Sequence, residues 1–323
     1  MAIELLFFVA GFALLVKGAD ILVDGAASIA TKLRVSALMI GLTVVALGTS
    51  MPELGVNIAA SLGGENEITL GNIVGSNIAN ILLILGFTAL IIPLRVKNET
   101  LWKEIPYGFM AALVLLVIAS DSLIMGRRSV IDTTDSYILL LFFSIFLAYV
   151  IGTAKAQRSI RSLFKREKRF KEFSAPLSIA MVIGGIIGVA VGGQWVVYGA
   201  VYIAGLLGLS EFLIGATIIA IGTSLPELVT SVVAAFKRQA DIMIGIISGS
   251  NIFNISFILG ISGLIRPIAV DGMRTFDLMF LLLASGLLFV FVFLDKKRLL
   301  SRREGVVFLL LFLAYILFTV WRG

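Results

Sequence analysis

The sequence predicts an all-α polytopic membrane protein in which ten transmembrane helices form two inverted five-helix repeats. Two observations support this fold class: the composition of the chain and an internal duplication. Of the 323 residues, 59% are hydrophobic and only 14% are charged, whereas soluble domains are about 45–50% apolar and about 25% charged. Because one spanning helix needs roughly 20 apolar residues, the composition excludes a separate soluble domain of ordinary size.

Ten apolar stretches are predicted to span the membrane. They are residues 3–24, 36–62, 68–92, 104–121, 130–152, 177–203, 210–236, 242–264, 275–294 and 305–321. The first stretch lacks the basic region that begins a signal peptide, so we interpret it as a spanning helix. The predicted domains are therefore a first repeat at 1–154, a basic cytoplasmic linker at 155–174 and a second repeat at 175–323.

The two halves of the chain are related by a shift of 174 residues. This shift aligns residues 41–95 with 215–269 without a gap, and 25 of the 55 aligned pairs are identical. The motif regions at 41–86 and 215–260 read GLTVVALGTSMPEL with GNIVGSNIANILLILG, and GATIIAIGTSLPEL with GIISGSNIFNISFILG. Five helices in each half mean that the second half enters from the opposite side. Inverted repeats of this kind are typical of secondary transporters, whose binding site lies where the halves meet.

The distribution of basic residues predicts the orientation of the chain. If the linker is cytoplasmic, 20 of the 26 Lys and Arg residues lie in loops on that side. The positive-inside bias then places both termini outside the cytoplasm. The net charge of +6 is explained in the same way, so nucleic acid is not an expected partner. The linker is interpreted as a connector, with binding to anionic lipids as the alternative.

The residue types that the chain lacks exclude several function classes. The sequence contains no cysteine and no histidine. Disulfides and thiolate metal sites are therefore impossible, and the commonest transition-metal ligand and general base is missing. Neither an enzyme nor a bound cofactor is expected.

Two glutamates are the strongest candidates for a functional site. Glu53 and Glu227 lie in the middle of predicted spans and are equivalent under the duplication. A buried charge in a membrane is costly and usually functional. Two carboxylates that meet where the repeats join would repel each other unless a cation lies between them, and a divalent cation balances their charge.

Hydroxyl side chains precede each glutamate by three and four residues. They are Thr49, Ser50, Thr223 and Ser224. This spacing places each pair and its glutamate on one face of a continuous helix. The prediction is that hydroxyl and carboxylate oxygens line the same cavity.

Each glutamate is also preceded by a proline, Pro52 or Pro226. Proline removes a backbone donor and pushes away the carbonyl four residues earlier. We therefore expect kinks that leave carbonyl oxygens of Ala46–Gly48 and Ala220–Gly222 free to bind an ion. Irregular backbone at membrane depth is tolerated where it lines such a cavity.

The second part of each motif adds further oxygen ligands. Ser76 and Asn80 are four residues apart, as are Ser250 and Asn254. An all-oxygen set of ligands suits hard cations, and flexible oxygens favour Ca²⁺ and Na⁺ over Mg²⁺. Asn77 and Asn251 are interpreted either as site residues or as helix-packing residues. Charged residues predicted to lie outside the site are Lys17, Asp20, Asp24, Glu65 and Glu67.

The paired G-T-S-x-P-E and G-S-N-I-x-N motifs resemble the α-repeats of the cation/calcium exchanger superfamily, closest to the prokaryotic sodium/calcium exchangers. The resemblance implies an antiporter of the prokaryotic plasma membrane whose second, third, seventh and eighth helices surround the ions. The first and sixth helices would slide across this core. The implied ion ligands are Ala46, Thr49, Ser50, Glu53, Ser76, Asn80, Ala220, Thr223, Ser224, Glu227, Ser250 and Asn254.

One departure from the superfamily bears on the counter-ion. Potassium-dependent relatives carry Asp where this chain has Asn254, which argues against K⁺ co-transport. The G-N-A-x-E motif of proton-coupled relatives is absent, so Na⁺ is the expected counter-ion. The alternatives are a Ca²⁺/H⁺ antiporter of the same fold and, less favoured, a Ca²⁺ channel. Besides the two ions and the lipid bilayer, no obligatory protein partner is expected.

Overall fold

The protein is a bundle of membrane-spanning helices. The computed structural model describes residues 2–121, 129–162, 172–207, 220–295 and 297–322. Within these ranges eight helices are long and apolar enough to cross a membrane, and a bent pair of helices adds a ninth candidate span. The predicted span 210–236 and the motif region 215–260 both begin outside the described residues. Residues 163–171 of the predicted linker also lie outside them. The described residues therefore hold eight or nine candidate spans where ten were predicted.

Each half of the chain consists mainly of helices, with two short strands. The first half contains α1 (Ala2–Leu33), α2 (Ala37–Ile40), the π-helix η1 (Gly41–Val45), α3 (Ala46–Thr49), α4 (Met51–Gly63), α5 (Asn66–Ile78), the π-helix η2 (Ala79–Ile84), α6 (Leu85–Ile91), β1 (Leu94–Arg95), α7 (Asn98–Trp102), α8 (Glu104–Ile118), β2 (Ser129–Ile131) and α10 (Thr133–Ser162). The second half contains α11 (Ala175–Leu206), α13 (Ala220–Thr223), α14 (Leu225–Phe236), α15 (Ala240–Ile252), the π-helix η4 (Phe253–Ile258), α16 (Leu259–Ile265), β3 (Ile268–Val270), α17 (Gly272–Leu294), β4 (Leu299–Leu300) and α18 (Arg302–Arg322).

The duplication in the sequence is also a duplication of secondary structure. Adding 174 to the bounds of α3, α5, η2 and α6 gives the bounds of α13, α15, η4 and α16. The repeated elements include a π-helix in each half, at η2 and η4. Single π-helical turns inside longer helices occur frequently at functional sites.

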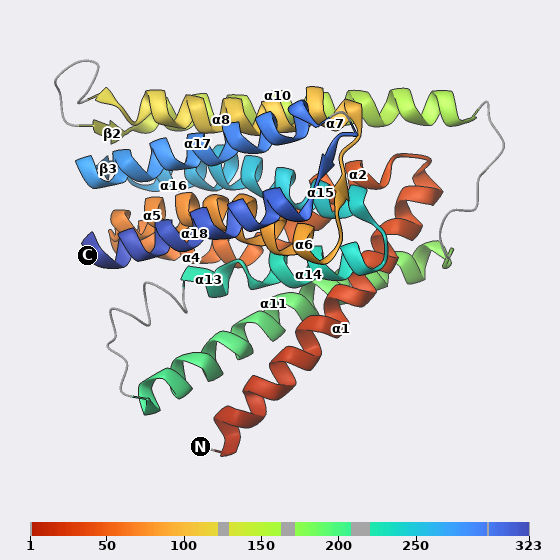
Figure 1. Cartoon of the computed structure of the whole chain (residues 1–323), viewed down its shortest axis with the longest axis horizontal. Coiled ribbons are helices and arrows are strands. Elements are labelled where there is room, and N and C mark those ends of the chain that lie inside the picture. Colours follow the sequence, from red (N-terminus) through yellow and green to blue (C-terminus); the bar gives the residue numbers. More distant parts are fainter. Residues whose placement is uncertain (1, 122–128, 163–171, 208–219, 296, 323) are drawn as a thin grey trace.

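Short strands, which the all-α prediction did not include, join the two halves. β1 pairs with β4, and β2 pairs with β3, both in antiparallel fashion. The β2–β3 pair lies at the end of the bundle that holds the C-terminus, while α7, which follows β1, lies at the other end (Figure 1). Under the 174-residue shift β1 corresponds to the first two residues of β3, so equivalent segments lie at opposite ends.

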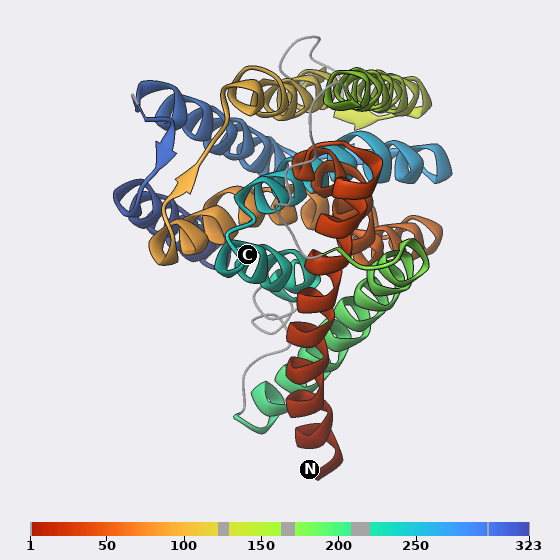
Figure 2. The same cartoon turned by 90° about the vertical axis from the view of Figure 1, so that its right-hand side faces the viewer.

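Helices α1 and α11 form a pair that projects from the rest of the bundle (Figures 1 and 2). Their contact is made at glycines spaced seven residues apart, at Gly11, Gly18 and Gly25 in α1 and at Gly185, Gly192 and Gly199 in α11. A Cβ atom at any of these positions would come within 2.9 Å of the partner helix. Small residues let membrane helices approach closely, and the shift of 174 relates the two sets to each other.

Two helices continue well past their predicted ends. α1 continues to Leu33 instead of ending at residue 24, and α10 continues to Ser162, into the region predicted as linker from residue 155. Hydropathy detects only the apolar part of a helix. The added segments contain Lys, Arg and Gln, which are good helix formers in an aqueous or interfacial setting.

The predicted kinks are confirmed as breaks in the helix. α3 ends at Thr49 and α4 begins at Met51, with a bend of 46° between the two arms. In the second half α13 ends at Thr223 and α14 begins at Leu225. Proline is the second residue of α4 and of α14, where its missing N–H leaves no helical bond unmade.

An ion-pair cluster joins α1 to the end of α14. The ammonium group of Lys237 lies 2.7 Å from Asp20 Oδ1 and 2.6 Å from Asp24 Oδ1, and it also donates to the Asp20 carbonyl at 2.8 Å. The largely exposed side chain of Lys17 lies 3.5 Å from Asp20 Oδ2. The predicted cluster of Lys17, Asp20 and Asp24 therefore exists, and its central cation is Lys237, which the sequence did not single out.

Replacing Lys237 with Gln is expected to destabilise the protein by about 1–2 kcal/mol, because it leaves two neighbouring carboxylates without their cation. The measurement is the midpoint of thermal unfolding in detergent. Lys17→Gln is the matched control, since the Lys17 side chain is 72% exposed against 24% for Lys237. The control is expected to stay within about 0.5 kcal/mol of wild type. Equal effects of the two variants would contradict the central role of Lys237.

Candidate ion-binding site

Glu53 and Glu227 are buried at the two helix breaks. Each lies in the first turn of its helix, α4 or α14, and each residue is only 1% exposed. The break before α4 places the Ser50 hydroxyl so that it donates to Glu227 Oε1 at 2.9 Å. A residue three positions before Glu53 therefore contacts the glutamate of the other half. The structure brings the two predicted centres together.

Two serines share one oxygen of Glu227. Ser50 Oγ lies 3.0 Å from Ser250 Oγ, and Ser250 also donates to Glu227 Oε1, at 3.4 Å. These three residues come from three separate elements: the break before α4, α14 and α15. The contacts orient the carboxylate and leave its second oxygen, Oε2, without a hydrogen bond among the described residues.

The two asparagines of the predicted site make a crossed pair of contacts between the halves. Asn80 Nδ2 donates to Asn251 Oδ1 at 2.9 Å, and Asn254 Nδ2 donates to Asn77 Oδ1 at 3.5 Å. Asn80 and Asn254 lie in the π-helices η2 and η4 and are buried. Each uses its nitrogen toward the other half, and the oxygen of each stays unbonded within the described part of the chain.

Six residues predicted as ligands carry a buried oxygen that has no hydrogen-bond partner among the described residues. These atoms are Glu53 Oε2, Glu227 Oε2, Asn80 Oδ1, Asn254 Oδ1, Ser76 Oγ and Ser224 Oγ. A buried polar atom without a partner costs about 1–3 kcal/mol, and more if it is charged. A cation bound by these oxygens would offset that cost, and carboxylate, amide and hydroxyl oxygens are the donors that Ca²⁺ and Na⁺ accept. The residues present therefore fit hard cations.

The prediction that the Ala46 carbonyl is left free is wrong. It accepts a hydrogen bond from the Ser50 N–H at 3.0 Å and another from Thr49 Oγ1 at 3.2 Å. In the second half the equivalent N–H, that of Ser224, bonds instead to the Ile221 carbonyl at 3.1 Å, three residues earlier. Ala220 is the first residue of α13. The carbonyl of Ala46 is occupied because the helix keeps its ordinary bond between residues four apart up to Ser50.

The hydroxyls and glutamates do not share one continuous helical face. The chain breaks at Ser50 and at Ser224. The Thr49 hydroxyl donates to the Ala46 carbonyl of its own helix and also lies within reach of the Glu227 carboxylate of the other half. In the second half Thr223 Oγ1 contacts Asn72 Oδ1 at 3.3 Å. Sequence reasoning missed Asn72, because the corresponding residue of the second repeat is Ile246 and the duplication therefore did not select it.

The acidic residues predicted to lie outside the site do so where the structure describes their side chains. Asp20 and Asp24 pair with Lys237. Glu65 precedes α5 and is exposed, as expected, whereas the side chain of Glu67 lies outside the described part of the structure.

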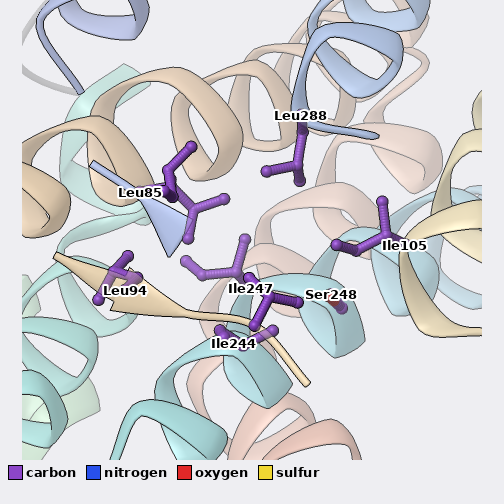
Figure 3. Close-up of a pocket in the computed structure, with 9 residues that line it drawn as sticks. Leu85, Leu94, Ile105, Ile244, Ile247, Ser248 and Leu288 are labelled. Carbon is purple, nitrogen blue, oxygen red and sulfur yellow. The ribbon is translucent and has the colours of Figure 1, made fainter. Parts of the chain in front are cut away.

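A separate recess is lined by neither glutamate and has a different chemistry. Leu85, Ile105, Ile247 and Leu288 point into it from α6, α8, α15 and α17, as Figure 3 shows. Ser248 supplies the one hydroxyl among the residues that line it. An apolar lining of this kind has no ligand set for a cation, so the recess is not part of the ion site.

Comparisons with known families, sequences and structures all give sodium/calcium exchangers or antiporters as similar proteins. The family model described as sodium/calcium exchanger protein matches residues 3–152 and 177–321. The putative antiporter CaxA of Alkalimonas amylolytica is 35% identical, over 98% of both chains. The sodium/calcium exchanger MaX1 of Methanosarcina acetivorans is 32% identical, also over 98% of both chains. A solved structure of the sodium–calcium exchanger NCX_Mj, soaked with Na⁺ and Sr²⁺, has a TM-score of 0.83 at 32% identity and covers 98% of each chain.

Proposed function

Because the chain belongs to the sodium/calcium exchanger protein family, we propose that it exchanges Ca²⁺ for Na⁺ across a prokaryotic plasma membrane by alternating access. The observation that carries this proposal is the cluster of buried oxygens around Glu53 and Glu227. Its oxygens come from both halves of the chain, as expected of a transporter whose site lies between repeats. The protein transports its ions without a cofactor and without chemistry on a substrate.

The charge of the site explains why the two ions exchange. Glu53 and Glu227 together carry two negative charges when ionised. One Ca²⁺ balances them, and so do two Na⁺. Further Na⁺ would bind at the hydroxyl and amide oxygens. Because both ions use the same carboxylates, they compete, and only a loaded site is neutral enough to pass the apolar face of a moving helix.

The proposed ligands are those carried over from the family motifs. They are Ala46, Thr49, Ser50, Glu53, Ser76, Asn80, Ala220, Thr223, Ser224, Glu227, Ser250 and Asn254. The unbonded oxygens of six of these residues support the assignment. Thr49 can keep its hydrogen bond to the Ala46 carbonyl, because the lone pairs of its own oxygen stay available to an ion. The Ala46 carbonyl already accepts two hydrogen bonds and would have to give one up to bind an ion. With neutral Asn80 and Asn254 in the ring, the proposed site does not take K⁺ as a co-substrate.

The proposed topology has ten spans in two inverted repeats, at 1–154 and 175–323, with the linker 155–174 in the cytoplasm and both termini outside. The placement of the equivalent strands β1 and β3 at opposite ends of the bundle supports it. The glycine-lined pair α1 and α11 is the proposed moving part. Close backbone packing without large side chains lets the two helices move as one body.

The test is uptake of ⁴⁵Ca²⁺ into proteoliposomes that contain the purified protein. Vesicles loaded with Na⁺ are expected to accumulate Ca²⁺, and vesicles loaded with K⁺ are not. Uptake driven by a pH gradient without Na⁺ would replace the proposal with Ca²⁺/H⁺ antiport. Entry without any counter-ion would indicate a channel and would refute exchange.

Replacing Ser50 with Ala is expected to raise the KM for Ca²⁺ about tenfold, because Glu227 loses its shorter hydrogen bond and Ser250 loses its neighbour. The KM is measured by Na⁺-driven ⁴⁵Ca²⁺ uptake. Ser144→Ala is the control, since Ser144 is bonded to the carbonyl of Leu140 on its own helix, far from the glutamates in sequence. A normal KM for Ser50→Ala would remove Ser50 from the site.

A further inference from the structure

Asn77 and Asn251 are not ligands in the family motif, but they contact Asn254 and Asn80, which are. Both are buried, and each accepts a hydrogen bond from the ligand asparagine of the opposite half. The contact of Asn80 with Asn251 is the shorter, at 2.9 Å against 3.5 Å. Elements α15 and η2 pack together, as do α5 and η4, so the same arrangement occurs twice.

The chemistry of an amide gives these contacts a consequence. The oxygen and nitrogen of an Asn side chain have nearly the same size, so packing does not select between its two orientations, and hydrogen bonds do. A cation binds the oxygen and is repelled by the NH₂ group. If Asn80 were turned around, it would present two donor hydrogens where an ion needs a lone pair.

From this arrangement we infer that Asn251, and in the other half Asn77, are positioning residues that hold the amide oxygens of Asn80 and Asn254 toward the ion. This inference rests on the proposed exchange function and names residues beyond its ligand set. The buried Oδ1 atoms of Asn80 and Asn254 have no hydrogen-bond partner among the described residues, which is the state this positioning maintains. Each half orients a ligand of the other, so the ion site depends on contact between the halves.

The experiment is a double-mutant cycle on Ca²⁺ binding, measured by isothermal titration calorimetry of the purified protein in detergent. Asn251→Leu removes the acceptor, and Asn80→Ala removes the ligand. Asn251→Leu is expected to weaken Ca²⁺ binding about tenfold, as the loss of an outer-shell partner typically does. The double variant is expected to bind as weakly as Asn80→Ala alone, because no amide is left to position.

Thr88→Val is the control substitution, since Thr88 is buried on α6 and its hydroxyl donates to the Ile84 carbonyl one turn earlier. In the double variant Thr88→Val with Asn80→Ala, the changes in the free energy of Ca²⁺ binding are expected to add. If the double variant instead lost Ca²⁺ affinity by the product of the two single losses, about a hundredfold, Asn251 would have a structural role and the inference would be overturned. Unchanged Ca²⁺ affinity of Asn251→Leu would overturn it as well. Absence of Ca²⁺ binding by the wild type would instead refute the proposed function, and the inference with it.

Discussion

Replacing Glu227 with Gln is expected to abolish Na⁺-driven Ca²⁺ uptake. The substitution keeps an oxygen that Ser50 and Ser250 can donate to but removes half of the negative charge of the site. With one carboxylate left, a divalent ion is no longer balanced. We expect Ca²⁺ affinity to fall by at least about 100-fold, which corresponds to about 2.7 kcal/mol.

A stability measurement separates this effect from misfolding. Two buried carboxylates without a cation repel each other, so Glu227→Gln is expected to raise the midpoint of thermal unfolding in ion-free buffer. The same variant is expected to lose the further stabilisation that Ca²⁺ gives the wild type. Glu65→Gln is the control, because Glu65 is exposed, and it is expected to transport normally. Wild-type uptake by Glu227→Gln would rule out the paired-carboxylate mechanism.

Replacing Gly18 with Leu is expected to separate α1 from α11 and to stop exchange. A Cβ atom at Gly18 would lie 2.8 Å from Val189 N and 2.9 Å from the Gly188 carbonyl carbon. These are backbone atoms, which cannot move aside as a flexible side chain can. Overpacking of a close interface costs typically 1–3 kcal/mol, and we expect a loss of about 3 kcal/mol with Ca²⁺ uptake reduced to background.

Gly184→Leu is the matched control on the same pair of helices. A Cβ atom at Gly184 meets no atom within 4 Å, and the residue is exposed on α11. Unfolding midpoint and uptake are both expected to stay near wild type. Gly18→Ala adds only the clashing Cβ atom and is expected to show an intermediate loss. If Gly18→Leu transported as well as Gly184→Leu, α1 and α11 would not need their close contact.

The sequence was sufficient to predict the membrane class, the duplication and the burial of Glu53 and Glu227. Periodicity and composition are local properties, and a repeat of identical motifs is visible without any structure. The same offset of 174 residues recurs in the bounds of α5 and α15 and of η2 and η4. The proline-dependent break was predictable too, since the loss of a backbone donor at Pro52 is a property of one residue.

Contacts between the halves were decided only by the tertiary structure. Lys237 as the cation for Asp20 and Asp24, Ser50 as a donor to Glu227, and Asn72 as the partner of Thr223 all join residues more than 150 positions apart. The second repeat holds no copy of Asn72, and neither Lys237 nor the aspartates have a charged counterpart, so the duplication could not reveal them. Which hydroxyls reach Glu227 from the first half depends on how the chain turns at Ser50. That turn is the result of packing between helices, which no single stretch of sequence contains.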